Sequence, residues 1–206
     1  MRLRLLALLL ITACASGSVP PVRSVWQQVR SSSNPRITIE VDPSLAYLGH
    51  VHQRAMNGRT EAEEYIFSEL DHGSLNRTFI VHFEHVEAGA TLLFRYPRME
   101  MVRLGRHEYL HQSFPEKDWD LFTDAGMKAL LANRGLTVPS TWLVSRWVRA
   151  TDRALKSEII LFYLEPAGDL PAPIDDLRLA GRSRELWKPI DREITVRGRE
   201  VFHLRD

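Results

Sequence analysis

The sequence predicts an α+β fold, mainly antiparallel β-sheet with one or two covering helices. Apolar and polar side chains alternate in several short segments, which is the pattern of half-buried strands. These segments follow one another closely, with turn residues between them, whereas parallel strands would need long crossovers. One segment, residues 119–133, instead has apolar residues at helical spacing and supplies a covering helix.

The first half of the folded part is predicted to begin with a brief helix. Ser24 and Gln27 have the spacing of a capping box, and the serine run before Pro35 ends the helix. Period-two patterning or short apolar runs then predict strands at 36–41, 77–86, 91–96, 99–104 and 107–112. The helix at 119–133 follows Pro115 and stops at Gly135.

The second half contains one ambiguous segment. Residues 140–156 fit either a helix or a hairpin, and their β-branched and aromatic residues favour the hairpin. Residues 158–164 are almost all apolar, which indicates a central strand buried on both faces. The proline-rich stretch 166–176 is expected to be a loop, and 194–204 a hairpin that turns at Gly198.

Length and composition indicate one folded domain and exclude some partners. The chain has 206 residues, 44% of them hydrophobic, which suffices for a core. It has 27 Lys and Arg against 26 Asp and Glu, and loss of residues 1–13 would remove Arg2 and Arg4. So balanced a charge offers no broad cationic field for phosphates, and we expect no nucleic-acid partner.

The N-terminal segment has the organisation of an export signal. Arg2 and Arg4 precede an apolar stretch at residues 5–11, and small residues follow it up to Cys14. The stretch is far shorter than the roughly twenty apolar residues that cross a bilayer, so it predicts a cleavable signal. Cys14 is the only cysteine, which leaves no partner for an intramolecular disulfide and no CxxC site.

Residues 11–14, Ile-Thr-Ala-Cys, resemble the lipobox of bacterial lipoproteins. The resemblance implies removal of 1–13, a diacylglyceryl thioether on Cys14 and usually acylation of the new N-terminus. Ala15 stands where an Asp commonly retains lipoproteins in the inner membrane, so the outer membrane is favoured. Residues 14–24 are rich in small residues and proline and would form a tether, and 25–206 the globular domain.

One motif allows a second interpretation. His107-Glu108-Tyr109-Leu110-His111 resembles the HExxH pattern of zincin metallopeptidases, which implies zinc on His107 and His111 and Glu108 as general base. The chemistry requires a helix, because only there do positions four apart share a face. Gly105 before the motif and Pro115 after it leave barely two turns, and on a strand Glu108 would face away from both histidines.

Other residues are also candidates for metal or ligand binding. His50 with His52, and His82 with Glu84, would each share a face of a strand and could join His107 and His111 around a metal. Solvated histidines on a half-buried sheet are the commoner explanation. The tryptophans could form a ligand-binding surface, but such residues more often fill the core (Trp26, Trp119, Trp142, Trp147 and Trp187).

The sequence as a whole favours a non-enzymatic envelope lipoprotein. It contains no GxSxG elbow, glycine-rich phosphate loop or dinucleotide fingerprint, and we expect no cofactor. The expected partners are membrane lipid, through acylated Cys14, and another envelope protein or component. The alternative is a periplasmic zinc-dependent hydrolase that uses the motif at 107–111.

Overall fold

The computed structural model describes residues 27–32, 35–96, 99–117, 125–178 and 182–205. The predictions for the signal, Cys14 and the tether lie outside these residues, as do Trp26, Trp119 and the start of the helix expected at 119–133. The described chain is mostly antiparallel β-sheet with three α-helices, which confirms the predicted α+β class. No helix in this part is long and apolar enough to cross a membrane.

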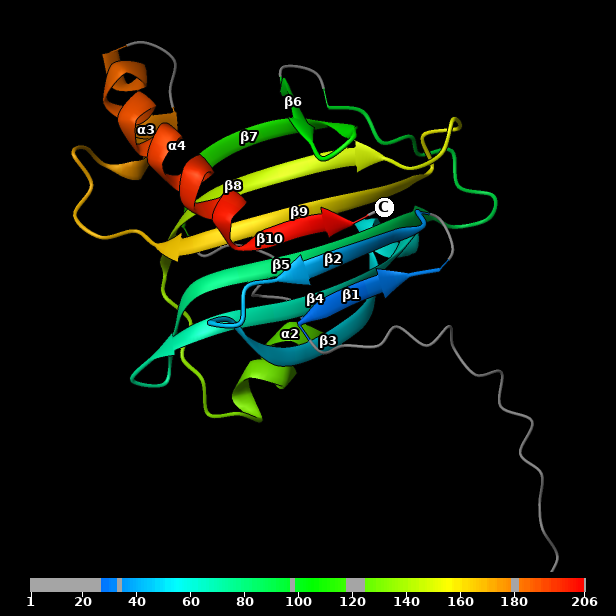
Figure 1. Ribbon diagram of the computed structural model, residues 1–206, viewed down its shortest axis with the longest axis horizontal. Helices are drawn as coiled ribbons and strands as arrows, with labels where there is room; N and C mark the ends of the chain where they lie inside the picture. Colours follow the sequence, from blue (N-terminus) through cyan, green and yellow to red (C-terminus); the bar gives the residue numbers. More distant parts are fainter. Residues whose placement is uncertain (1–26, 33–34, 97–98, 118–124, 179–181, 206) are drawn as a thin grey trace, which may run out of the picture.

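The largest element is a seven-stranded antiparallel sheet (Figure 1). Its strands, from one edge to the other, are β3 (Ala46–Ala55), β4 (Thr60–Asp71), β5 (Ser74–Val86), β9 (Ser157–Pro166), β8 (Thr141–Ala150), β7 (His107–Lys117) and β6 (Glu100–Leu104). The short 3₁₀ turn η1 (Met56–Gly58) joins β3 to β4. As predicted, the apolar segment at 158–164 forms the central strand, β9, and residues 140–156 belong to the β8–β9 hairpin.

A second sheet of three strands lies across one face of the first. It comprises β1 (Gln28–Ser31), β2 (Ile37–Val41) and β10 (Phe202–Arg205), with β2 in the middle. The brief helix expected after Ser24 is therefore wrong for residues 28–31, which pair with β2. The segment at 91–96, expected to be a strand, has no regular secondary structure, although its Phe94 is buried.

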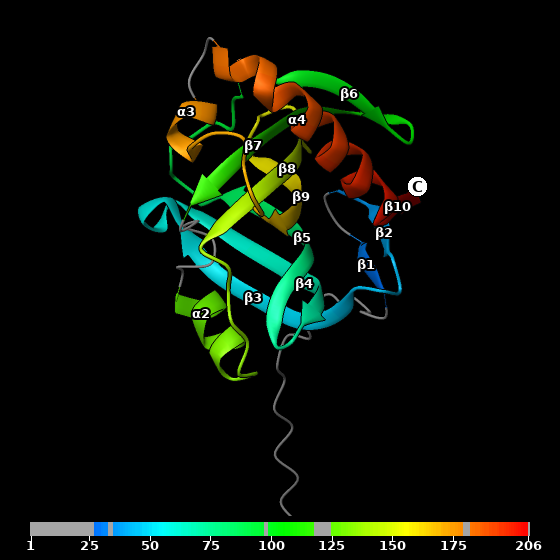
Figure 2. The same ribbon diagram turned by 90° about the vertical axis from the view of Figure 1, so that its left-hand side faces the viewer.

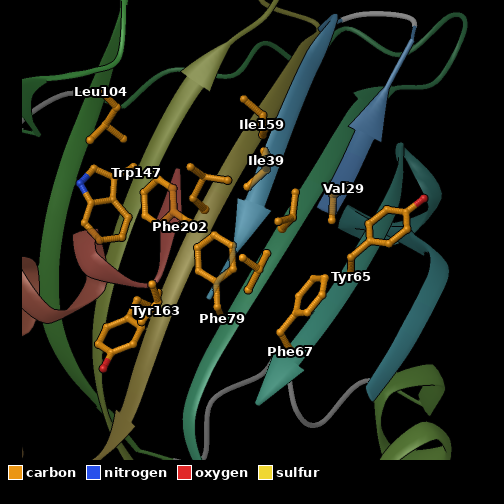
Figure 3. Packing of buried hydrophobic residues seen from close by; sticks show 14 of the residues in the cluster. Val29, Ile39, Tyr65, Phe67, Phe79, Leu104, Trp147, Ile159, Tyr163 and Phe202 are labelled. Atoms are coloured by element: carbon orange, nitrogen blue, oxygen red, sulfur yellow. The ribbon is translucent and has the colours of Figure 1, made fainter. Parts of the chain in front are cut away.

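The two sheets enclose an aromatic and aliphatic core (Figure 3). Phe202 of β10 stacks on Phe79 of β5 at 4.9 Å between ring centroids and meets Trp147 of β8 edge-on at 5.4 Å. Val29 and Ile39 point from the small sheet toward the same core, and both are fully buried. The alternation seen at 36–41 and 77–86 thus arises because one side of each strand faces this core.

The long helix α4 (Arg182–Glu200) was not foreseen, and the hairpin expected at 194–204 is wrong. Gly198 does not turn the chain but lies in the helix against the sheet. A Cβ at this position would stand 2.6 Å from Cη2 of Trp147 and 3.0 Å from Cδ1 of Tyr163. Glycine is needed because the helix backbone approaches these rings so closely, and Arg197 adds hydrogen bonds of 2.7 Å to both carboxylate oxygens of Glu165.

The opposite face of the large sheet is covered by α2 (Ala125–Ala132), at the far side from α4 and the small sheet (Figure 2). Met127 and Leu131 of α2 pack there on Leu48, Trp142 and other buried residues. The predicted helix at 119–133 is confirmed over these eight residues. The loop expected at 166–176 gives way at its end to the short helix α3 (Ile174–Arg178).

Candidate functional site

A cluster of ionisable side chains is buried in the face of the large sheet that α2 also covers. Glu64 comes from β4, His82 and Glu84 from β5, and Glu158 from β9. Glu64 stands opposite His82 in the strand pairing, and Glu84 opposite Glu158, so all four share one face. None is more than 7% exposed. Charged residues are rarely buried without partners, and these are therefore the best candidates for a functional site.

His82 is held between two carboxylates. Its Nδ1 lies 3.0 Å from Oε1 of Glu64, and its Nε2 lies 3.0 Å from Oε2 of Glu84. Both ring nitrogens must donate to acceptor-only groups, which requires the imidazolium form. Burial favours the neutral ring, but the hydrogen bonds to the two glutamates outweigh burial and raise the pKa of His82 to about 9.

The two glutamates that face each other across β5 and β9 differ in acidity. Burial would raise the pKa of Glu84, but the hydrogen bond from His82 prevails and lowers it. Burial also dominates at Glu158, where neighbouring Glu84 adds to it, and the pKa of Glu158 rises to about 7. Near neutral pH the cluster thus contains an ionised carboxylate beside one that is close to its midpoint.

Tyr96 covers Glu158 from the irregular segment that follows β5. Its hydroxyl lies 2.7 and 2.8 Å from the two carboxylate oxygens of Glu158, to which it donates. The guanidinium of Arg146 stands 5.9 Å from the centre of the Tyr96 ring and 5.1 Å from that of Phe114. Burial lowers the pKa of Arg146, and the aromatic faces offer its charge partial compensation.

This arrangement holds protons better than it holds a metal. A metal would need a ring nitrogen lone pair, and both nitrogens of His82 are committed as donors to glutamates. Within the described ranges, no group of three or more His, Cys, Asp or Glu side chains is placed to bind a metal ion. Glu158 is the group that can exchange a proton near neutral pH, and Tyr96 donates a hydrogen bond to it.

The HExxH-like segment is not helical. Residues 107–111 form the start of β7, where His107 and His111 share one face and exposed Glu108 lies on the other. The zincin arrangement, in which the glutamate lies beside the metal, does not form in this strand.

His111 instead helps to pack α4 against the sheet. Its Nε2 lies 2.9 Å from Oγ of Ser145 and 3.3 Å from Oγ1 of Thr195, and its ring stacks on Trp147. Burial lowers the pKa of His111 and favours the neutral ring. Asp191 of the same helix accepts a hydrogen bond from Ser113. Because Ser145 is fully buried, this serine–histidine pair stabilises the helix–sheet contact.

The remaining sequence candidates fall in separate places. His50 stacks on Tyr65 and His52 is 3.9 Å from Glu61, on the face opposite His82. His82 and Glu84 do share a face, as expected, but they do not meet the histidines of β3 or β7. Trp142 and Trp147 are fully buried and Trp187 packs against the core, as expected of structural tryptophans.

Two members of the cluster, Glu64 and Glu158, and the tyrosine that contacts it, Tyr96, were missed from sequence. A signal existed for Glu158, because it opens the segment that was predicted to be buried on both faces. A different signal was present for Glu64, which shares the buried side of β4 with Ala62 and Ile66 at a spacing of two. Tyr96 carried none, since it lies in an irregular segment.

A separate cavity of about 320 Å³ lies beside the small sheet, between β1, β2 and the end of α4. The acidic side chains that line it have partners or face solvent. Glu40 accepts from Gln28 at 2.8 Å and pairs with Arg205 at 2.7 Å, and Asp42 accepts from the backbone of Ser44. The hydrogen bonds of Glu40 and Asp42 thus stabilise the ends of the strands around the cavity.

No known protein family matches the chain, and no curated protein or solved structure is significantly similar to it. What the chain does must therefore be argued from its own residues.

Proposed function

We propose that this protein is a lipoprotein of the bacterial cell envelope, whose folded part binds another envelope component close to the membrane. The observation that supports it is the position of the only cysteine, Cys14, at the end of a short apolar leader and within a lipobox-like sequence. Several acyl chains on one residue anchor a protein stably, which a single chain does not achieve. Anchoring is useful when the partner is local, because it raises the effective concentration.

The number of residues between Cys14 and the folded part limits how far the domain would stand from the lipid. Thirteen peptide units separate Cys14 from Gln27, and a fully extended chain spans at most about 3.5 Å per residue. Gln27 would therefore remain within about 45 Å of the lipidated residue. Strand β1 begins at the next residue and belongs to the three-stranded sheet, so the anchor would join the domain on that side, away from α2 (Figure 2).

The polar clusters at His82 and His111 are engaged within the fold, so the proposed binding would use the surface instead. His82 is engaged by Glu64 and Glu84 on both sides of its ring, and the Ser145–His111 pair is buried beneath α4. These groups hold elements of the structure together. The surface, in contrast, carries single apolar residues at both edges of the large sheet, such as Tyr47 in β3 and Met101 in β6, which is 63% exposed.

Metabolic labelling with radiolabelled fatty acid tests the anchor. The full chain should incorporate label and sediment with membranes, whereas Cys14→Ser should do neither, because no thiol remains for the thioether. Ser16→Ala, which leaves the cysteine in place, is the matched control and should label like the wild type. Equal labelling of the wild type and Cys14→Ser would overturn the proposed anchor.

The proposed membrane is tested separately with Ala15→Asp. If the chain follows the sorting rule of the lipoproteins it resembles, this change moves it from the outer-membrane fraction to the inner-membrane fraction on a sucrose gradient. Labelling should be unchanged, since the cysteine is intact. A wild type already in the inner membrane would refute the outer-membrane assignment while leaving the anchor standing.

Binding of a local partner is tested by photo-crosslinking in cells. A photoreactive residue at Tyr47 or Met101 should give an adduct of defined mass in the anchored protein. In Cys14→Ser at equal abundance the adduct should weaken at least tenfold, because the effective concentration is lost. Adducts that are unchanged without the anchor, or absent at both sheet edges, would contradict the proposal.

A further inference from the structure

Segment 88–96, which follows β5, contacts the buried cluster through Tyr96, whose hydroxyl lies against Glu158. The segment has no regular secondary structure. Across residues 91–96, the backbone makes one hydrogen bond to the rest of the described chain, from the Phe94 amide to the Leu155 carbonyl at 2.8 Å. So few backbone bonds mark a part of the fold that can open locally.

Side chains provide most of what holds this segment down. Phe94 is 5% exposed, and the Tyr96 hydroxyl touches both carboxylate oxygens of Glu158. Nearer β5, the ammonium of Lys156 donates to the Ala90 carbonyl at 3.3 Å. The carboxyl of Glu158 changes its charge near neutral pH, and it is in direct contact with Tyr96 of this segment.

We propose that segment 88–96 is a proton-controlled cover, which lies closed over the cluster while Glu158 is protonated and opens as Glu158 ionises. The groups that face Glu158 come from each neighbouring element: Glu84 and His82 from β5, Arg146 from β8 and Tyr96 from the cover itself. The closed cover keeps water from a carboxylate that has another carboxylate directly across the strand pair. Opening restores hydration to the ionised form.

Linkage between protonation and opening sets the size of the effect. In the closed state the pKa of Glu158 is about 7, with burial as the main cause and the Tyr96 hydrogen bond acting against it. A glutamate carboxyl exposed to water would have a pKa near its ordinary value of 4.5. The closed-to-open equilibrium therefore falls by up to about 300-fold as the pH rises from below 4.5 to above 7.

Hydrogen exchange of the Phe94 amide tests the cover in the full chain. After correction for intrinsic exchange, its protection should fall at least tenfold between pH 5 and pH 8 in the wild type. Glu158→Gln keeps an acceptor for Tyr96 but cannot ionise, so its protection should be the same at both pH values. The Leu75 amide, bonded to the Thr137 carbonyl far from the cluster, is the internal control and should not change.

A pH-independent Phe94 amide in the wild type, or the same pH dependence in Glu158→Gln, would overturn the proposal. Tyr96→Phe gives a second variant should Glu158→Gln fail to fold. Removing the hydroxyl takes away the group that favours the ionised carboxylate, so the pKa of Glu158 in the closed state should rise further. The fall in Phe94 protection should then continue to higher pH and be larger in total than in the wild type, and a smaller total fall would contradict control by Glu158.

Proteolysis at a single pH offers an independent measurement. Arg95 is exposed within the cover, and trypsin can cleave after it only when the segment leaves the sheet. At pH 8 the wild type should be cut there at least ten times faster than Glu158→Gln. Equal rates would count against the proposal whatever the outcome of the lipid-labelling experiments, because the cover does not depend on the anchor.

Discussion

Two clusters of histidine and glutamate lie on opposite faces of the large sheet, one on β4 and β5 and the other on β3, β4 and β5. On the face that α2 covers, the side chains of Glu64, His82 and Glu84 are at most 8% exposed and their contacts are 3.0 Å long. On the opposite face, Glu61 lies 3.9 Å from His52 and 3.4 Å from His85, and both histidine side chains are more than half exposed. The residue types match, so the difference in geometry follows from burial.

Because Glu64, His82 and Glu84, the inner cluster, are buried, their contacts should contribute strongly to the free energy of unfolding. A charge removed from water must be paired, and the loss of one partner leaves the others uncompensated. An exposed cluster exchanges its contacts for water at little cost. The comparison between Glu64–His82–Glu84 and His52–Glu61–His85 therefore predicts responses of different size to substitution and to salt.

The largest difference is expected between two histidines of β5, three residues apart and on opposite faces. His82→Leu leaves Glu64 and Glu84 buried without their cation and should lower the free energy of unfolding by about 3–5 kcal/mol at pH 6.5. His85→Leu should cost less than about 1 kcal/mol. Urea denaturation followed by circular dichroism measures both, and similar losses would remove the basis of the comparison.

The pH dependence of the wild type should follow the inner cluster. The raised pKa of His82 gives stability that is complete below 6.5 and lost as the pH rises through about 9. Glu158 acts in the same direction, because its protonated form is favoured in the fold and is lost as the pH rises from 4.5 through about 7. Each contributes up to about 3 kcal/mol.

The lowered pKa of Glu84 has the opposite sign, and its contribution disappears as the pH falls below its usual value of 4.5. The free energy of unfolding should therefore be greatest near pH 5 and decline toward pH 9. Denaturation at pH 4, 5, 7 and 9 measures the profile. Glu158→Gln should flatten the part below 7 and His82→Leu the part above it, whereas a wild-type profile that rises toward pH 9 would be inconsistent with the cluster.

The packing of α4 on the large sheet allows the next test. Gly198 of α4 lies against Trp147 and Tyr163, and an added Cβ would meet the indole at 2.6 Å. Gly198→Ala should destabilise the fold by about 1–3 kcal/mol, because overpacking outweighs the higher helix propensity of alanine. Gly168→Ala, with no atom within 4 Å of the new Cβ, is the control and should be nearly neutral. Thermal unfolding of the two variants compares them directly, and equal midpoints would show that α4 can shift outward freely.

How much of this could be predicted from sequence depended on whether a pattern was local. Alternation at 36–41 and 77–86 and the apolar run at 158–164 identified strands, because each strand presents a fixed face to the core. The C-terminal helix was missed because Val196, Gly198 and Val201 favour a strand or turn by propensity. Tertiary contact with Trp147 and Tyr163 decides that segment, and such contact is invisible in a local pattern.

The candidate site was harder to predict for the same reason. His82 and Glu84 were noticed as neighbours on one face, but their partners come from β4, β9 and the irregular segment before residue 97. The pairing register that places Glu64 opposite His82 is set by the whole sheet. The HExxH-like motif shows the converse, since its local spacing matches while its backbone is extended.

The smallest effect is expected at the exposed cluster, and salt makes it informative. Glu61→Gln removes the carboxylate between His52 and His85 and should cost less than about 1 kcal/mol, since water replaces its contacts. At 1 M salt, where the screening length falls to about 3 Å, even this loss should vanish. Glu64→Gln, the matched change on the covered face of the same strand, should remain destabilising by more than 1 kcal/mol in both salts, because ions do not enter a fully buried contact. If denaturation instead showed salt weakening the Glu64→Gln effect as well, the inner cluster would be open to solvent in the native state, and burial would no longer separate the two faces.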